Sequence, residues 1–156
     1  MQRFDELDMK LLFELTMNGN ISVPVLSKKL GINASVLYSR IKRLMKKKVI
    51  KKFTIEMDDS LLGIGVKASV GINRDPKFKT QIHKELLKID EIISISEVTG
   101  RFDIMIEVYS LDLEDLHTIV IEKIGKIEGV QNTETFVELQ KTDKDPAFLL
   151  KIHKKS

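Results

Sequence analysis

Hydroxyl-bearing and basic side chains crowd the stretch from residue 28 to residue 46, and together they can bind a polyanion. Hydroxyls donate and accept hydrogen bonds, and an arginine fork can pair with two acceptors on a base edge or on a phosphate. Arg40 is the best candidate for such a bidentate contact, although it could instead pair with an acid. The predicted DNA-contacting residues are Lys28, Lys29, Asn33, Ser35, Val36, Tyr38, Ser39, Arg40, Lys42, Arg43 and Lys46.

Apolar spacing predicts three helices that would carry these side chains. The first has Asp5 at its N-cap, Asp8 at its third position, and one apolar face made of Leu7, Leu11, Leu12 and Leu15. The second follows a cap at Ser22 and ends at Gly31, where a left-handed turn is expected. Two short helices joined at a glycine are typical of a helix-turn-helix.

The third predicted helix begins after its cap, Asn33, and has two different sides. Leu37, Ile41 and Leu44 recur at i, i+4 and i+7, so they should pack on the first two helices. The opposite side carries the hydroxyl and basic groups, as a recognition helix in a major groove requires. Polar groups near its start would meet base edges, while basic groups towards its end would hold phosphates.

Charge is distributed unevenly along the 156 residues, whose net charge is +3. Residues 1–52 contain 12 Lys and Arg against 4 Asp and Glu, a net +8, and residues 53–156 contain 14 against 19, a net −5. A basic third on an acidic remainder suggests two domains, of which only the first meets a polyanion. A solvated, lysine-rich helix end is the alternative explanation for the charge alone.

The acidic remainder predicts strands and helices in the order β-α-β-β-α-β, which is a ferredoxin-like fold. Alternation places Phe102 with Ile104 and Ile106 on the face that two helices should cover. Met105, Tyr109 and Phe136 fall out of phase, so they should lie on the other face, where a second copy could cover them. Isolated apolar residues at a rim are the alternative.

These patterns divide the chain into four parts and give an α+β fold class. Residues 1–52 form a winged-type helix-turn-helix DNA-binding domain, and residues 53–65 form a linker with a short strand. Residues 66–141 form the ferredoxin-like βαββαβ domain, whose open sheet face favours dimerisation, and residues 142–156 form a tail. Within the linker, the alternation of Phe53, Ile55 and Met57 predicts the strand.

From about Phe4 to about Lys141 the chain resembles the Lrp/AsnC (feast/famine) family of transcriptional regulators. Leu7-Asp8 and the segment VLYSRIKRLMKKKVI are similar to the family's N-terminal pattern and recognition helix. The resemblance continues in the second domain through Val98-Thr99-Gly100 with Phe102-Asp103, and through Gly129-Val130 with Thr133 and Thr135.

The resemblance implies that residues 66–141 are the family's dimerisation and effector-binding (RAM) domain. It also implies dimers that associate into tetramers, octamers or open assemblies, with small effectors, often amino acids, bound between dimers. Asp103 could hold an α-ammonium group, and threonine hydroxyls could fix the ligand's orientation. The effector positions implied are Gly100, Arg101, Phe102, Asp103, Thr133, Glu134 and Thr135.

The chain departs from the family pattern at several places. Lys48 stands where the family usually has glycine, and Arg101 places a bulky cation in the effector loop. Arg101 could bind an acidic effector, pair with Glu134 or block the pocket. The tail from Thr142 reaches beyond the family's usual end.

Other classes of function fit the sequence less well. The three histidines are scattered, and neither a nucleophile elbow nor a nucleotide-binding loop is present, so we expect no enzyme, catalytic residue, cofactor or metal site. The acidic second domain argues against RNA binding. An amino-acid-binding module with secondary or absent DNA binding is the alternative function. With no cysteine, signal peptide or membrane span, a cytoplasmic protein is expected.

Overall fold

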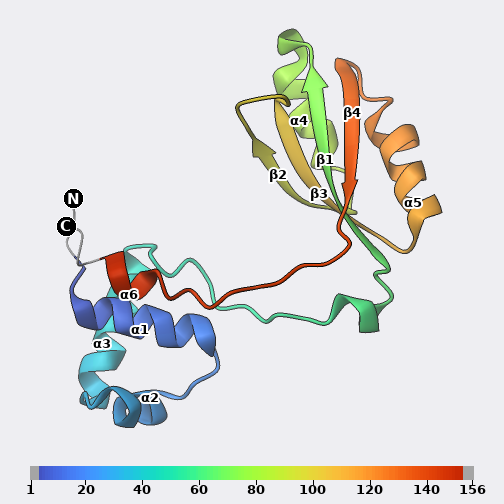
Figure 1. The fold of residues 1–156 in the computed structure, drawn as a ribbon. Helices are drawn as coiled ribbons and strands as arrows, with labels where there is room; N and C mark the ends of the chain where they lie inside the picture. The colour runs from blue at the N-terminus through green and yellow to red at the C-terminus, as the bar shows by residue number, and fades with distance from the viewer. Residues whose placement is uncertain (1–3, 153–156) are drawn as a thin grey trace. The chain divides into compact units, whose positions relative to one another are not determined.

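The structure is a computed structural model that describes residues 4–152, and it separates into two compact units (Figure 1). One unit holds the described residues up to Glu56 together with those from Thr142 onwards, and the other holds Met57–Lys141. The two units are described one at a time. Among residues 4–152, no helix combines the length and the apolar character needed to cross a membrane.

Three helices build the first unit: α1 (Glu6–Met17), α2 (Val23–Leu30) and α3 (Ala34–Lys46). The predicted start of α1 is confirmed, because the Asp5 carboxylate accepts the Asp8 backbone N–H at 2.8 Å while the Asp8 carboxylate accepts the Asp5 N–H at 3.3 Å. The fully buried core joins all three helices and consists of Leu11, Leu26, Leu37 and Leu44. A short fourth helix, α6 (Leu149–Ile152), also belongs to this unit.

The turn between α2 and α3 has the predicted conformation. Gly31 has φ 66°, in the left-handed region that glycine enters at little cost. The Asn33 side chain accepts the Ser35 N–H at 2.9 Å and so caps α3, as expected. Ser22 occupies the N-cap position of α2, but the prediction that its side chain caps the helix is wrong, because its hydroxyl makes no capping hydrogen bond.

Four antiparallel strands form the second unit: β1 (Val66–Arg74), β2 (Ile92–Glu97), β3 (Ile104–Ser110) and β4 (Val130–Val137). Their order in the sheet is β2-β3-β1-β4, which is the predicted ferredoxin-like topology. One helical layer begins as a short 3-10 turn at Pro76–Phe78 and continues as α4 (Lys79–Leu86). The other consists of α5 (Leu113–Thr118) and a π-helix over Ile119–Ile124.

Both helical layers cover the same face of the sheet (Figure 1). The core between the sheet and these helices contains alternate residues of the central strands, such as Val70 and Ile72 from β1 and Ile106 from β3. Ile82 of α4 and Ile119 of the π-helix meet them from the helical side. The other face, which we call the open face, carries Met105 and Tyr109, both half-buried, and Phe136, as predicted.

Two sequence predictions about this part of the chain are wrong. Phe53, Ile55 and Met57 form no strand, because this extended segment has no neighbouring strand with which to exchange hydrogen bonds, and a 3-10 turn (Asp59–Leu62) follows it. Phe102 does not continue the alternation of β3, since the strand begins only at Ile104. Its ring lies on the open face, 6.1 Å from the ring of Phe136.

Candidate functional site

The recognition helix α3 is held from one side and exposed on the other. Leu37 and Leu44 are fully buried, and Ile41 packs partly buried against the same cluster. On the opposite side Val36 and Tyr38 are 43% and 53% exposed. The other exposed side chains on this side are Ser35, Ser39, Lys42 and Lys46. The helix therefore presents hydroxyl and ammonium groups from a rigid element, which is what contact with base edges and phosphates requires.

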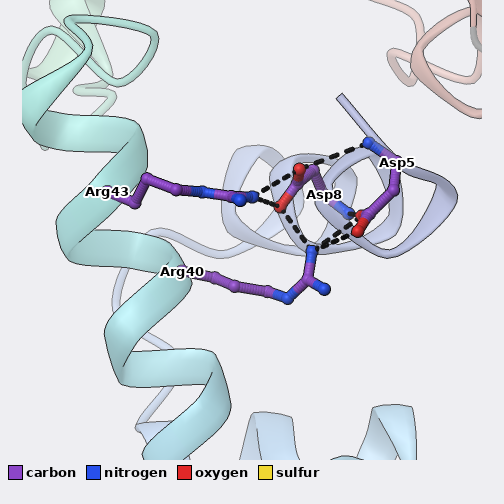
Figure 2. A network of polar contacts seen from close by, with 4 residues as sticks. All are labelled: Asp5, Asp8, Arg40 and Arg43. Carbon is purple, nitrogen blue, oxygen red and sulfur yellow. Dashed lines mark hydrogen bonds and ion pairs between the residues drawn. The ribbon is translucent and has the colours of Figure 1, made fainter. Parts of the chain in front are cut away.

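Two predicted DNA-contacting arginines, Arg40 and Arg43, point to the N-terminus of α1 (Figure 2). The Arg40 Nη1 donates to Asp5 at 2.7 Å and to Asp8 at 2.8 Å, and the Arg43 Nη2 donates to both Asp8 oxygens at 2.6 Å. The Asp8 side chain is only 2% exposed, so it is a buried carboxylate shared by two guanidinium groups. Of the two alternatives for Arg40, the structure shows the pairing with acids.

Two residues of this cluster, Asp5 and Arg40, have shifted pKa values. Burial alone would raise the pKa of Asp5, but the hydrogen bonds from Arg40 and from the Asp8 backbone outweigh it, so the pKa of the Asp5 carboxyl is lowered. The hydrogen bond to Asp5 raises the pKa of Arg40 in turn. Both shifts favour the ionised pair, which fixes the start of α1 against the middle of α3.

The remaining candidates differ in how far they are engaged within the chain. Lys29 pairs with Glu14 of α1, while Lys28 beside it is exposed. The Lys42 ammonium lies 4.8 Å from the centre of the Tyr38 ring, so these neighbours on one helix face form a cation–π pair. Asn33 uses its side-chain oxygen to cap α3 and to accept the Ser35 hydroxyl at 2.8 Å.

The exit of α3 explains the glycine that the family usually has at position 48. Lys48 has φ 56°, the only positive φ of a non-glycine residue in the described chain. The Lys48 N–H bonds to the Met45 carbonyl, and the Val49 N–H bonds to the Leu44 carbonyl at 2.9 Å, closing the end of the helix. A lysine thus adopts the left-handed conformation in which a side chain is strained.

In the second unit, a second cluster lies on the open face around the loop before β3. The Arg101 guanidinium lies 5.4 Å from the centre of the Phe102 ring and pairs with Glu134 of β4 at 2.6 Å. Of the alternatives for Arg101, the structure shows the pairing with Glu134. Phe102 covers Gly71 of β1 so closely that a Cβ at that position would lie 2.5 Å from the ring.

The structure brings only some of the predicted effector positions together. Arg101, Phe102 and Glu134 converge, whereas the strand register places Thr133 and Thr135 on the helix-covered side, opposite Ile72 and Val70. Gly100 has φ 130° in the loop. The Asp103 carboxylate accepts the Arg74 backbone N–H at 3.0 Å, beside the irregularity where β1 leaves its register with β4.

Sequence reasoning missed Gly71 as a member of this cluster. A single glycine inside a strand pattern often marks the close approach of another group, and that signal is present in VKASVGIN. Phe136 was predicted on the open face, but its edge-on contact with Phe102, at an interplanar angle of 73°, was not. A sequence alternation cannot reveal that contact, because one partner lies outside any strand.

Comparison with protein families decides what this architecture belongs to. The model of the Lrp/AsnC ligand-binding domain matches residues 67–148, more than half of the chain. The chain belongs to the Lrp/AsnC family. A winged helix-turn-helix DNA-binding model matches residues 4–51, so this family member is a transcriptional regulator that combines a DNA-binding domain with a ligand-binding domain. The ligand-binding match runs as far as Phe148 and so includes the first residues of the predicted tail.

Curated relatives of this Lrp/AsnC regulator are named as regulators too. An uncharacterised HTH-type transcriptional regulator of Pyrococcus furiosus is 37% identical over 136 residues, covering 85% of this chain and 91% of its own. The HTH-type transcriptional regulator FL11 of the same organism is 31% identical over 136 residues, covering 87% of this chain and 89% of its own.

Solved structures agree with the two-unit architecture. Escherichia coli AsnC is 26% identical with a TM-score of 0.84, covering 92% of this chain and 97% of its own. A transcriptional regulator from Neisseria meningitidis, solved as a complex with L-Met, has a TM-score of 0.86 over 92% of this chain and 94% of its own. At 19% identity the second likeness concerns the fold alone.

Proposed function

We propose that this regulator binds double-stranded DNA in the cytoplasm as a homodimer or larger assembly, with the exposed side of α3 in the major groove. The observation that carries the proposal is the division of α3 into a fully buried apolar side and an exposed polar side. We assign base-edge contacts to the side chains nearest the helix start, and phosphate contacts to the lysines that have no acidic partner among the described residues. The first group is Asn33, Ser35, Val36, Tyr38 and Ser39; the second is Lys28, Lys42 and Lys46.

In this proposal, three of the predicted DNA-contacting cations have a different role: Lys29, Arg40 and Arg43. Their cationic groups have acidic partners in α1, so the two arginines act mainly by orienting α3. The Arg43 side chain is still 44% exposed and can offer other N–H groups to a phosphate. Arg40 is 23% exposed, which leaves it less able to reach a base than the sequence alone suggests.

A test of the DNA proposal needs a duplex chosen by the protein itself. We would select binding sequences from a random duplex pool and measure affinity by fluorescence anisotropy. Tyr38→Ala should weaken binding to the selected duplex by about 1–3 kcal/mol, roughly 5- to 150-fold, if it contacts a base. Met17→Ala, at a residue 45% exposed on α1, is the matched control and should bind as the wild type does. Equal affinities for the two variants would remove Tyr38 from the interface.

We further propose that the open face pairs with the same face of a second copy. Phe136 is 45% exposed, and with Met105 and Tyr109 it gives the sheet an apolar patch that lacks a helical cover. A symmetric pair would supply two recognition helices for a palindromic site. Phe136→Asp should shift the mass measured by light scattering towards the monomer, and an unchanged mass would place the interface elsewhere.

For the effector, we propose an amino acid bound near Arg101, Phe102 and Asp103, with Gly100 and Glu134 beside them. Thr133 and Thr135 lie on the helix-covered side of β4 and have no part in this site. The ring of Phe102 offers an apolar surface, and Arg101 and Glu134 offer opposite charges for a zwitterion. The ligand in the Neisseria meningitidis structure is L-Met, which makes methionine a reasonable first member of an amino-acid panel.

The effector proposal is tested by melting and light scattering across that panel. A ligand that prefers one state raises the melting temperature or shifts the assembly size. Asp103→Asn should abolish the shift while keeping an acceptor for the Arg74 N–H, so the loop stays folded. Glu122→Gln, an exposed acid in the π-helix, is the control. If no amino acid shifted the melting temperature or the assembly size, a regulator that acts without an effector would be favoured. If an amino acid caused such a shift but the protein bound no DNA, the amino-acid-binding module would be favoured.

A further inference from the structure

The side of α1 that faces away from the helix-turn-helix core is apolar and covered. Leu11 marks the centre of the core side. Met9 and Phe13 lie two residues before and after it, and a helix turns about 100° per residue, so both lie nearly opposite Leu11. Met9 is nevertheless only 5% exposed, although it is absent from the core that joins α1, α2 and α3. Something other than α2 and α3 therefore covers this side, which we call the back surface of α1.

The C-terminal segment packs on α1 within the same unit. Figure 1 shows α6 against that helix, and the two elements are in contact. Leu149 and Leu150 are half-buried, as is Pro146 before them. The segment closes on itself through the Leu149 N–H to the Pro146 carbonyl at 2.9 Å and the Lys151 N–H to the Phe148 carbonyl at 3.0 Å. The Phe148 ring itself is 63% exposed.

The same helix thus has a different partner at each of three places. Its core side packs on α2 and α3 through Leu11. Its N-terminus holds Arg40 and Arg43 of α3 through Asp8. It also contacts α6, the end of the segment that continues from β4, the strand that bears Glu134. Residues 138–148 connect β4 to α6, so a covalent path of 11 residues joins the sheet to the back of α1.

We propose that the C-terminal segment of this chain is a docking strap, with residues 146–150 seated on the back surface of α1, and that DNA binding depends on its docking. The strap packs on the side of α1 that is opposite the core, so it stabilises the position of α1 and with it the ion pairs of Asp8 with Arg40 and Arg43. Because the strap begins at β4, it also offers a route by which events at the sheet reach the recognition helix without passing through the linker at residues 53–65. This inference rests on the DNA-binding function proposed above.

The test compares two neighbouring aspartate substitutions in the full chain. Leu149→Asp places a charge at a half-buried strap position, and Phe148→Asp places the same charge at the exposed position beside it. Hydrogen exchange of the α1 amides and anisotropy with the selected duplex are measured for both. Leu149→Asp should speed α1 exchange at least 10-fold and weaken DNA binding at least 5-fold, while Phe148→Asp should leave both as in the wild type.

A chain ending at Lys141 provides the second variant and should reproduce Leu149→Asp in both measurements. Equal α1 exchange in the wild type, Leu149→Asp and the shortened chain would overturn the docking of the strap. Faster exchange with unchanged DNA affinity would overturn its role in DNA binding. If the wild type itself failed to bind any duplex, the proposed function would fall, whereas the exchange measurement would still decide whether the strap docks.

Discussion

The shared carboxylate of Asp8 gives the sharpest prediction about how the recognition helix is held. Asp8→Asn keeps the size of the side chain but removes its charge and replaces one acceptor oxygen by an N–H₂ group. In the native chain the Asp8 Oδ1 accepts from both Arg40 and Arg43, and the Oδ2 accepts from Arg43 and from the Asp5 N–H. At least one guanidinium therefore loses its charge-assisted bond at a position where the carboxylate is 2% exposed.

The size of the effect follows from how buried each partner is. Breaking a buried ion pair costs about 3–5 kcal/mol, because a charge is left without compensation. Here Arg40 and Arg43 keep 23% and 44% of their side-chain surface exposed and can regain water, so the loss should be smaller. We expect Asp8→Asn to lower the free energy of unfolding of the first unit by about 2–3 kcal/mol, which for a unit of this size lowers its melting temperature by roughly 10–20 °C.

Differential scanning calorimetry with hydrogen exchange of α1 and α3 measures this loss and assigns it to the correct unit. Glu6→Gln is the matched control, since it changes an exposed acid of the same helical turn that pairs with Lys10 at 2.8 Å. An exposed pair of this kind contributes at most about 0.5 kcal/mol. If Asp8→Asn cost no more than Glu6→Gln, the network in Figure 2 would not hold α3 and the reasoning would fail.

Three further predictions concern backbone strain and pH. Lys48→Gly should raise the free energy of unfolding of the first unit by about 0.5–1 kcal/mol, because glycine adopts the left-handed φ of 56° without strain. Lys47→Gly should lower the same free energy, because Lys47 has an unstrained φ of −80° and glycine only adds backbone freedom there; one calorimetric method measures both. Gly129→Ala should destabilise the sheet unit by about 2–4 kcal/mol, because residue 129 has φ 92° and its new Cβ would lie 2.3 Å from the Phe78 Cβ. Gly31→Ala is the comparison: its φ of 66° is also left-handed, but the space around it is open, so the change should cost only about 1 kcal/mol in the first unit. The lowered pKa of Asp5 means that its pairing stabilises the fold above the ordinary pKa of aspartate, and that this stabilisation is lost as the pH falls further. The free energy of unfolding of the first unit, measured in urea, should therefore decrease below about pH 4, and Arg40→Gln should make it depend less on pH.

The sequence predicted the helix-turn-helix well, because its signals are local. The caps at Asp5 and Asn33, the left-handed Gly31 and the spacing of Leu37 and Leu44 each act within one or two helical turns. The order of strands in the second unit followed for the same reason, since alternating positions need only their own segment to be recognised.

Contacts between distant segments escaped the sequence. Nothing local distinguishes an arginine that meets a base from one that meets Asp8, 32 residues away in the chain. Likewise, alternation assigned Phe102 to the wrong face because the strand starts two residues later, and Gly71 was not linked to its ring. The strand predicted at residues 53–57 failed because a strand needs a hydrogen-bonding partner, which no pattern within that segment supplies.

The salt dependence of DNA binding tests the central claim most directly. If a dimer brings two copies of Lys28, Lys42 and Lys46 to phosphates, about six contacts form, and the log–log slope of affinity against salt should be near −5. Anisotropy with the selected duplex should then show a loss of affinity of roughly 1,000-fold between 50 and 200 mM salt. In Lys42→Ala the dimer loses about two phosphate contacts, so the slope should become correspondingly shallower. A slope near zero, or one unchanged in Lys42→Ala, would contradict the assignment of α3 as the helix that meets DNA.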